Sequence, residues 1–468
     1  MLIRGAELEG GRLADLRIQN GHVVAIGQLT SAAGEASIEA CGGLLLPGLH
    51  DHHIHVAALA AAAASVQCGP PHVASLEALT AAMTEALRIS GTGWLRGIGY
   101  HESVAGMLDA GMLDAIAADR PIRVQHRGGR MWFLNTMALD LLLAGRAAPP
   151  ELERIDGRFT GRLFEADAWL KTALAGRPPS FGAIGTMLAR RGVTGLTEIS
   201  PANDAVIAGH FAAEHANGNL PQRVTLAGRS ALSWDDMADG ITLGPVKLHL
   251  HEAALPAFDD ILQSIRGAHD QNRAVAVHCV TEVELVFTLA AIDEAGAMRG
   301  DRIEHASIAP DSAVEEIARL GLAVVSQPHF IAERGDAYRH SVAANDQPLL
   351  YRLRAFLDAD VTLAGGSDAP FGGADPWTSM AAAVSRRTRS GAMIGAAEAL
   401  TPEQALDLYL AAPEDLRRRR RVEIGAPADL CLLDRGWARA RDDLALVGVC
   451  ASWTDGRLVH DRIDQPPA

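Results

Sequence analysis

Short apolar runs and longer amphipathic stretches alternate along most of this 468-residue chain. After residue 40, eight apolar runs have the length expected of buried strands, and helical patterns such as residues 256–268 and 283–295 separate the last seven. The predicted strands are residues 44–49, 195–199, 223–226, 246–250, 274–279, 302–306, 323–327 and 361–365. Strand–helix alternation predicts parallel pairing, so we expect an α/β fold with a closed (β/α)8 TIM barrel over residues 46–404.

The two ends of the chain have a different pattern. Residues 1–45 and 405–468 carry short alternating strands with glycine turns, for example at Gly21 and at Asp455-Gly456. We expect these two ends to join in one small composite β-sandwich domain.

The interval between the first and second predicted strands is too long for a single crossover. Residues 69–180 are therefore expected to form an insertion. Strand patterns at 94–99 and 122–125 and a helical pattern at 105–118 indicate that this insertion is ordered. We expect it to be a subdomain that covers the substrate at the mouth of the barrel.

Side chains that bind metals follow several of the predicted strands. His53 and His55 come at i and i+2 after the break at Pro47-Gly48, and alternate residues of a strand point to one face. Converging neutral imidazoles are typical of a metal site. One ligand-type residue also lies at or near the end of four later runs: Lys247, His278, His305 and Asp368. The carboxyl ends of barrel strands meet at one mouth, so we expect these six residues to surround one site.

Taken singly, some of these residues have ordinary structural explanations. His278 could be a core histidine, Lys247 an unmodified lysine paired with an acid, and Asp368 the N-cap of a helix. The ordered set favours metal ligation for His278 and Asp368, while both interpretations of Lys247 stay open.

Together these motifs resemble the amidohydrolase superfamily of metal-dependent hydrolases. The resemblance rests on Pro-Gly-x-x-Asp-x-His-x-His from Pro47, a lysine strand, two single-histidine strands, Gly366-Ser367-Asp368 and a closing Gly-x-Pro-Ala-Asp-Leu from Gly425. Within the superfamily the chain is similar to the family 3 branch that includes N-substituted formamide deformylases. The residues that carry this second likeness are Asn135 to Leu139, Gly161 to Glu165 and Gln327-Pro328.

The resemblance implies one or two divalent metal ions, with zinc expected. His53, His55 and Asp368 would hold one ion, and His278 and His305 the second. A protonated lysine has no lone pair to offer a metal. Family members with a lysine on this strand often carry it carboxylated, so the resemblance implies a carboxylated Lys247 that bridges two ions.

Such a centre predicts hydrolysis of a non-peptide C–N bond, in an amide or cyclic amide, through a metal-activated hydroxide. Asp368 is the predicted general acid and base. Glu304 is expected to be structural because it alternates away from the mouth, and Asp51 and Glu198 are expected to orient ligands. A lactonase or esterase on the same metal core is the alternative function, because fold and ligands do not separate C–N from C–O substrates. A non-catalytic regulatory relative is less favoured, since all six ligands are present.

Substrate selection is predicted where the chain departs from this branch. Gly128-Gly129-Arg130 stands where the branch has Asp-Gly-His, so a guanidinium replaces an imidazole. We expect Arg130, with its neighbours Arg127 and Trp132, to bind an anionic substrate group. The alternative is that Arg130 pairs with an acid of the insertion itself.

Two more histidines are expected to line the pocket. His249 follows Lys247 on the same predicted strand face, and His329 follows Gln327-Pro328. A third metal held by His249 and His251 is disfavoured.

Composition limits the partners of the protein. The net charge of −15 argues against nucleic acid, which needs a basic surface. No apolar run reaches the roughly 18–20 residues that span a bilayer. The 5 cysteines are odd in number and form no CxxC motif, which indicates free thiols in a reducing cytoplasm. We therefore expect a cytoplasmic enzyme with a small-molecule substrate and neither nucleic-acid nor membrane partners, and leave homo-oligomerisation open.

Overall fold

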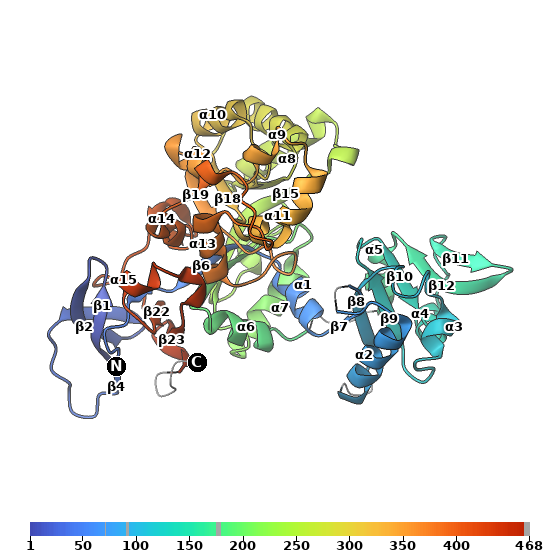
Figure 1. Cartoon of the computed structure of the whole chain (residues 1–468), viewed down its shortest axis with the longest axis horizontal. Coiled ribbons are helices and arrows are strands. Elements are labelled where there is room, and N and C mark those ends of the chain that lie inside the picture. Colours follow the sequence, from blue (N-terminus) through green and yellow to red (C-terminus); the bar gives the residue numbers. More distant parts are fainter. Residues whose placement is uncertain (71, 90–92, 175–178, 463–468) are drawn as a thin grey trace. The chain divides into compact units, whose positions relative to one another are not determined.

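The computed structural model describes residues 1–70, 72–89, 93–174 and 179–462. It consists of two compact units, the barrel unit (Met1–Val56 with Ser180–Ala468) and the inserted unit (Ala57–Pro179). Figure 1 shows the elements of both units. Residues 175–178 of the predicted insertion and residues 463–468 of the predicted terminal domain lie outside the described residues.

The barrel unit is built on eight strands in one sheet, and neighbouring strands in this sheet are parallel. In sheet order the strands are β6 (Leu49–Ile54), β13 (Val193–Glu198), β14 (Arg223–Gly228), β15 (Ile241–His249), β16 (Val275–Cys279), β17 (Arg302–His305), β18 (Ala323–Ser326) and β19 (Thr362–Gly365). Gly366, just after β19, lies against His53 of β6, where an added Cβ would be 2.4 Å from the His53 Cβ. The sheet is therefore a nearly closed parallel barrel, as the alternating pattern predicts.

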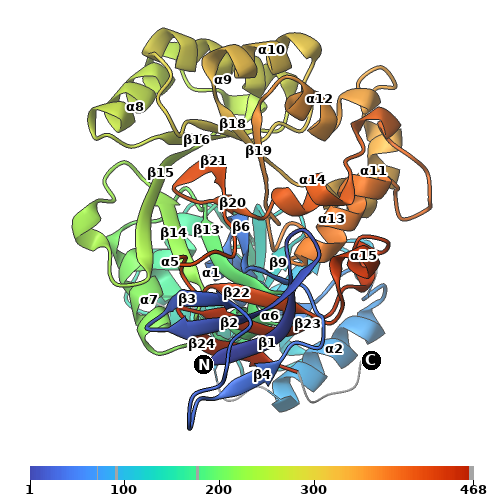
Figure 2. The same ribbon diagram turned by 90° about the vertical axis from the view of Figure 1, so that its left-hand side faces the viewer.

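Helices precede or connect the later barrel strands. They are α6 (Gly182–Ala189), α7 (Ala205–Ala216), α8 (Phe258–Asp270), α9 (Glu282–Ala295), α10 (Asp311–Leu320), α11 (His329–Ser341) and α12 (Leu353–Asp358). Two more helices, α13 (Pro376–Ser385) and α14 (Pro402–Asp407), follow the last barrel strand. Figure 2 shows α8, α9, α10 and α12 along the outer side of β16, β18 and β19. The predicted helices at 256–268 and 283–295 correspond to α8 and α9.

The first predicted strand, residues 44–49, is wrong as a single element. Leu45–Pro47 forms β5, which pairs with β22 (Leu430–Leu433) in a different sheet, and the barrel strand begins at Leu49. Gly48 separates the two, because an added Cβ there would lie 2.1 Å from the Thr194 Oγ1 of β13. This close approach between distant segments has no signature in the local hydrophobic pattern.

Both chain ends contribute to a pair of four-stranded sheets. One contains β1 (Leu2–Leu8), β2 (Arg12–Gln19), β3 (His22–Gly27) and β4 (Ser37–Glu39), and the other contains β5, β22, β23 (Val449–Thr454) and β24 (Arg457–Asp461). A single buried cluster includes Leu16 and Ile3 from the first sheet and Trp453 and Leu430 from the second. The short elements β20 (Ala411–Ala412), β21 (Asp415–Arg419) and α15 (Trp437–Ala440) complete the unit.

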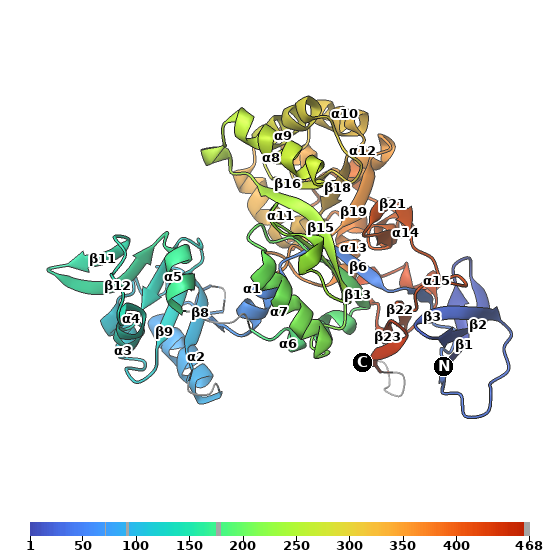
Figure 3. The same ribbon diagram turned by 180° about the vertical axis from the view of Figure 1, so that it is seen from behind.

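The inserted unit contains a six-stranded mixed sheet (Figure 3). Its order is β11 (Leu152–Ile155), β12 (Arg158–Phe164), β10 (Met131–Leu134), β9 (Ile122–His126), β8 (Leu95–Tyr100) and β7 (Val66–Gln67). The helices of this part of the chain are α1 (Val56–Ala63), α2 (Leu76–Ile89), α3 (Ala110–Asp114), α4 (Thr136–Leu143) and α5 (Asp167–Leu174). The helix predicted at 105–118 is shorter, because the Asp109 side chain accepts a hydrogen bond from the Met112 N–H and caps α3 there.

In the part of the chain that the structure describes, none of the helices is long and apolar enough to cross a membrane.

Candidate metal centre

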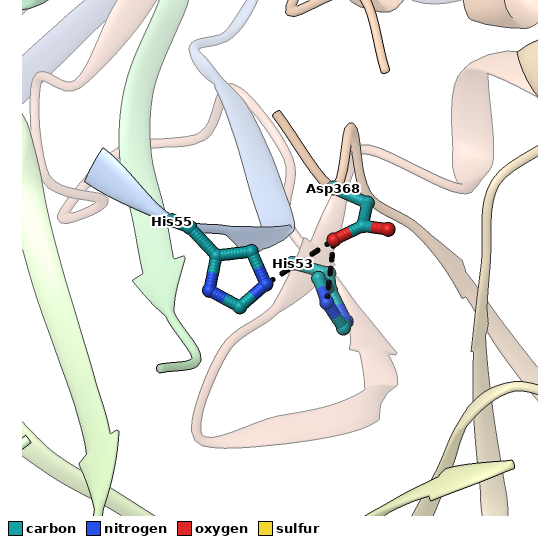
Figure 4. Close-up of side chains that lie close together, drawn as sticks. All are labelled: His53, His55 and Asp368. Atoms are coloured by element: carbon teal, nitrogen blue, oxygen red, sulfur yellow. Dashed lines mark ion pairs between the residues drawn. The ribbon is translucent and has the colours of Figure 1, made fainter. Parts of the chain in front are cut away.

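Three predicted ligands converge at one end of the barrel sheet. Figure 4 shows His53, on β6, and His55, just after it, with their rings facing Asp368 from the loop after β19. The Asp368 Oδ1 lies 3.3 Å from the His53 Nε2 and 3.2 Å from the His55 Nε2. One ligand atom from each residue falls within 4.8 Å of the others, a spacing that could hold a metal ion.

The backbone at this site is in unusual conformations. Asp368 has φ 52° and His305 has φ 72°, both in the left-handed region. Non-glycine residues adopt this region only when the surrounding structure enforces it, and such residues cluster at functional sites. The two strand ends are therefore shaped to direct these side chains.

His305 and His278 extend the group along the neighbouring strands. The His305 ring centroid is 4.6 Å from that of His53 and 4.5 Å from that of His278. Burial, followed by the nearby His53, lowers the pKa of His305 to about 3. Burial and the neighbouring His305 also lower the pKa of His278. Both imidazoles are therefore neutral, as metal ligation requires.

Each of three histidines has its Nδ1 atom engaged by a polar neighbour. The His53 Nδ1 donates to the Glu304 Oε2 at 2.5 Å, and the His305 Nδ1 donates to the Gln327 Oε1 at 2.8 Å. The His55 Nδ1 bonds to the Ser200 Oγ at 2.9 Å. With Nδ1 protonated, the lone pair is on Nε2, so the acceptor oxygens of Glu304 and Gln327 select the tautomer that a metal needs in His53 and His305. The Ser200 hydroxyl is compatible with the same tautomer in His55.

The prediction that Glu304 is only structural is wrong. Its other carboxylate oxygen, Oε1, accepts a hydrogen bond from the Arg302 Nε at 2.7 Å, so the carboxylate joins Arg302 to His53. Burial acts to raise the pKa of Glu304, but Arg302 and His53 lower it further than burial raises it. Strict alternation fails here because β17 ends in the left-handed residues His305 and Ala306.

Asp51 and Glu198 hold backbone rather than imidazoles. The Asp51 Oδ1 accepts hydrogen bonds from the backbone N–H groups of His53 (3.1 Å) and Ser367 (3.0 Å). Glu198 accepts from the backbone N–H of Val56 at 2.6 Å. Burial raises the pKa of Asp51 to about 6. The two carboxylates thus fix the segments that carry His53, His55 and Asp368.

Lys247 is buried at 5% exposure, and its Nζ has no hydrogen-bond partner among the described residues. Burial lowers its pKa to about 8, although Glu304 acts in the opposite direction. A buried amine with its hydrogen bonds unmade is costly and calls for a further group beside it. In the described part of the chain, no acid forms the hydrogen bond or ion pair with this amine that would be expected for an unmodified lysine.

The sequence profile of the amidohydrolase family matches residues 36–460. The chain belongs to the amidohydrolase family.

Individual proteins agree with this membership. The N-substituted formamide deformylase of Arthrobacter pascens is 26% identical over 95% of this chain and 94% of its own length. A metal-dependent hydrolase from Pyrococcus horikoshii OT3 has the same fold, with a TM-score of 0.75, 19% identity and coverage of 93% of this chain and 97% of its own. The atrazine chlorohydrolase TrzN of Arthrobacter aurescens TC1, solved with zinc, gives a TM-score of 0.52 at 16% identity, over 99% of this chain and 95% of its own.

The predicted family is therefore confirmed. The prediction that this chain is an amidohydrolase, an enzyme acting on non-peptide carbon–nitrogen bonds, is confirmed at the level of the family. The individual site residues are not tested by these likenesses, and their roles stay predictions.

Two histidines predicted to line the pocket occupy different positions in this amidohydrolase. The exposed His249 stacks on His278, with ring centroids 4.3 Å apart. His329 is buried, and its Nε2 donates to the Ser367 carbonyl at 2.9 Å while its Nδ1 lies 3.1 Å from the Ser379 Oγ. Both ring nitrogens of His329 are engaged, so its contacts support the loop that carries Asp368 rather than a substrate.

The other substrate-binding candidates belong to the inserted unit. Arg127 is exposed in the turn between β9 and β10. Arg130 has a side chain 78% exposed that pairs with Glu165, so it has the acid partner that the sequence left as the alternative. Trp132 is 5% exposed in a hydrophobic cluster, which fits a core residue better than a substrate contact.

Proposed function

We propose that this amidohydrolase cleaves the C–N bond of a small amide or cyclic amide at the metal centre described above. The observation that carries the proposal is the convergence of His53, His55 and Asp368 within 4.8 Å, with the Nδ1 atoms of both histidines engaged elsewhere. An arrangement that leaves two Nε2 lone pairs and a carboxylate facing one point suits a divalent cation.

The donor set fits such an ion. His53, His55 and Asp368 would hold one ion, and His278, His305 and Lys247 would provide for a second. Nitrogen and carboxylate donors suit zinc, and the structurally similar atrazine chlorohydrolase contains zinc, so zinc is the proposed metal. When bound, a divalent ion lowers the pKa of a water to about 7 and polarises the substrate carbonyl.

Asp368 is the proposed general acid and base. Burial would raise its pKa, but the close contacts with His53 and His55 outweigh burial and keep the pKa well below its usual range. An ionised carboxylate at this point can take the proton of the attacking water and pass it to the departing nitrogen. Asp51 positions the backbone on both sides of this exchange.

Carboxylation of Lys247 is part of the proposal. Its buried Nζ has no partner in the described residues, and reaction of the neutral amine with CO₂ would form a carbamate and release one proton. The carbamate oxygens would serve as anionic ligands shared by two ions.

The substrate is proposed to be an N-substituted amide, because the deformylase of Arthrobacter pascens matches nearly the whole chain. We further propose that the inserted unit selects it, that residues 1–45 and 405–468 form one composite domain, and that the enzyme works in the cytoplasm. The hydrophobic cluster shared by both chain ends supports the second point, and the free cysteines support the third.

A substrate panel tests the function directly. The zinc-loaded protein would be assayed with N-substituted formamides, cyclic amides and lactones of the same ring size. Amide hydrolysis that is lost with a chelator and restored by zinc is expected. Turnover of the lactones without turnover of any amide would instead establish an esterase.

A further inference from the structure

Two arginines stand side by side on the sheet of the inserted unit. Arg96 of β8 and Arg123 of β9 are register partners in a parallel pair of strands. Like charges at directly neighbouring strand positions repel and destabilise a sheet. A pair in this arrangement therefore needs a compensating charge.

The described residues supply no such charge. The Arg96 guanidinium donates to the Ser65 Oγ at 3.0 Å and to the Gln125 Oε1 at 3.1 Å, and both acceptors are neutral. The Arg123 Nε is buried with no hydrogen-bond partner. Neither arginine forms an ion pair with an acid in the described part of the chain, in contrast to Arg162 of the same sheet, which pairs with Glu153 at 3.1 Å.

The two cations are also partly removed from water. Burial and, to a smaller extent, the nearby Arg96 lower the pKa of Arg123 to about 10. Both guanidiniums remain protonated at neutral pH, so two desolvated positive charges face each other. A neighbouring anion would relieve both the repulsion and the lost hydration.

Tryptophan rings fix the guanidiniums in place. The Trp132 ring centroid lies 5.5 Å from the Arg96 Cζ and 5.6 Å from the Arg123 Cζ, and the Trp94 centroid lies 5.8 Å from the Arg123 Cζ. Cation–π contacts of this kind hold a guanidinium in position but leave its net charge uncompensated. The result is a rigid, partly exposed pair of hydrogen-bond forks beside flat aromatic surfaces.

We propose that Arg96 and Arg123 form a binding site for the carboxylate of a small molecule, with the half-buried Trp94 beside it and the buried Trp132 behind the two guanidiniums. Guanidinium forks match the geometry of a carboxylate, and the Trp94 ring favours a flat group attached to it. The site is assigned from the inserted unit alone and does not depend on the proposed hydrolysis. It also differs from the sequence-based prediction, which gave the anion to Arg130.

Calorimetric titration of the full chain with benzoate, and with neutral benzamide as the control ligand, tests the site. Benzoate is expected to bind saturably and benzamide at least about tenfold more weakly, because only benzoate is charged. Arg96→Met and Arg123→Met should each weaken benzoate binding by about tenfold or more. The matched control is Arg154→Met, which removes an arginine stacked on Phe159 at 4.1 Å in the same sheet but without an arginine neighbour. It should change binding less than twofold.

Benzoate binding that survives both substitutions would place the anion elsewhere and overturn the proposal. An equal loss in Arg154→Met would do the same, because it would reflect the stability of the unit. If Arg96→Met or Arg123→Met does not fold, crystals of the wild-type protein soaked with 4-bromobenzoate decide the matter. Bromine signal beside both guanidiniums is expected, and signal only at other places, or none, contradicts the site.

Discussion

The Glu304 network of the barrel unit and the arginine pair of the inserted unit differ in how they accommodate buried charge. In the barrel unit, the buried Glu304 accepts hydrogen bonds from both His53 and Arg302, so the charge is satisfied within the protein. In the inserted unit, Arg96 and Arg123 are neighbours and form no ion pair with an acid among the described residues. A network with all its hydrogen bonds made holds the side chains of candidate metal ligands in one geometry, whereas a pair of cations without an acid is complementary to an anionic ligand. The residues proposed for catalysis therefore rest on charges that are paired within the protein, whereas the residues proposed for ligand binding carry charges that a ligand would pair.

Among the substitutions in the barrel unit, Asp368→Asn is expected to reduce activity the most. The substitution keeps the shape of the side chain but removes the proton acceptor, so kcat should fall by about 10²–10⁴ while most of the metal is retained. Steady-state kinetics and metal analysis check this. Asp358→Asn, which alters an exposed acid paired with Arg354, is the control and should leave kcat unchanged. Near-normal turnover of the Asp368 variant would move the acid–base role to another residue.

Loss of Lys247 is expected to have the next largest effect. Lys247→Ala removes the proposed bridge, so the metal content should fall from two ions per chain to one, with loss of most activity. A short carboxylic acid added to this variant should restore part of the activity by replacing the bridging oxygens. Metal analysis measures the number of ions per chain, and mass spectrometry of the intact wild-type protein measures the carboxylation of Lys247. A bare ammonium on Lys247 in a fully metallated protein would rule out the bridge.

Glu304→Gln tests the hydrogen bonds that join Glu304 to His53 and Arg302. The amide cannot carry the charge that holds the His53 Nδ1 proton, so zinc affinity should decrease by about 10–100-fold. Competition with a chromophoric chelator measures this affinity. Glu315→Gln, on the exposed face of α10, is the matched control. Equal affinities for wild type and the Glu304 variant would reduce Glu304 to a packing residue.

The strand ends and the candidate ligands on them could be predicted from the sequence because parallel barrel strands bring their carboxyl ends to one mouth. His53, His278 and Asp368 each follow an apolar run, which makes them visible without any structure. Glu304 could not be assigned correctly, because alternation assumes a regular strand and His305 has a positive φ. The sequence does contain a signal for Gln327, in the Gln327-Pro328 pair, but it does not reveal which histidine Gln327 contacts.

Features that depend on contacts between segments far apart in the sequence could not be predicted from the local hydrophobic pattern. The division of residues 44–49 depends on the contact between Gly48 and Thr194. The neighbouring positions of Arg96 and Arg123 depend on the register of β8 and β9, because 26 residues lie between them in the sequence. Arg130 stood out in the sequence because its segment departs from related proteins, whereas the paired arginines have no local signature.

The smallest effect is expected for Arg130→Met in the inserted unit. Its exposed ion pair with Glu165 is screened by solvent, so the free energy of unfolding should change by less than about 1 kcal/mol. Urea denaturation measures the change. A loss of more than about 2 kcal/mol would mean that Arg130 is part of the packing of the unit. Its sequence-based role in anion binding stays a prediction, to be compared with Arg123→Met in the same titration.

A crystal structure of the zinc-loaded enzyme tests the central claim most directly. We expect a metal ion about 2.0–2.2 Å from the Nε2 atoms of His53 and His55 and from a carboxylate oxygen of Asp368, with His278 and His305 directed toward the same centre. Zinc bound at other residues, or His278 and His305 turned away from the His53–His55 pair, would contradict it.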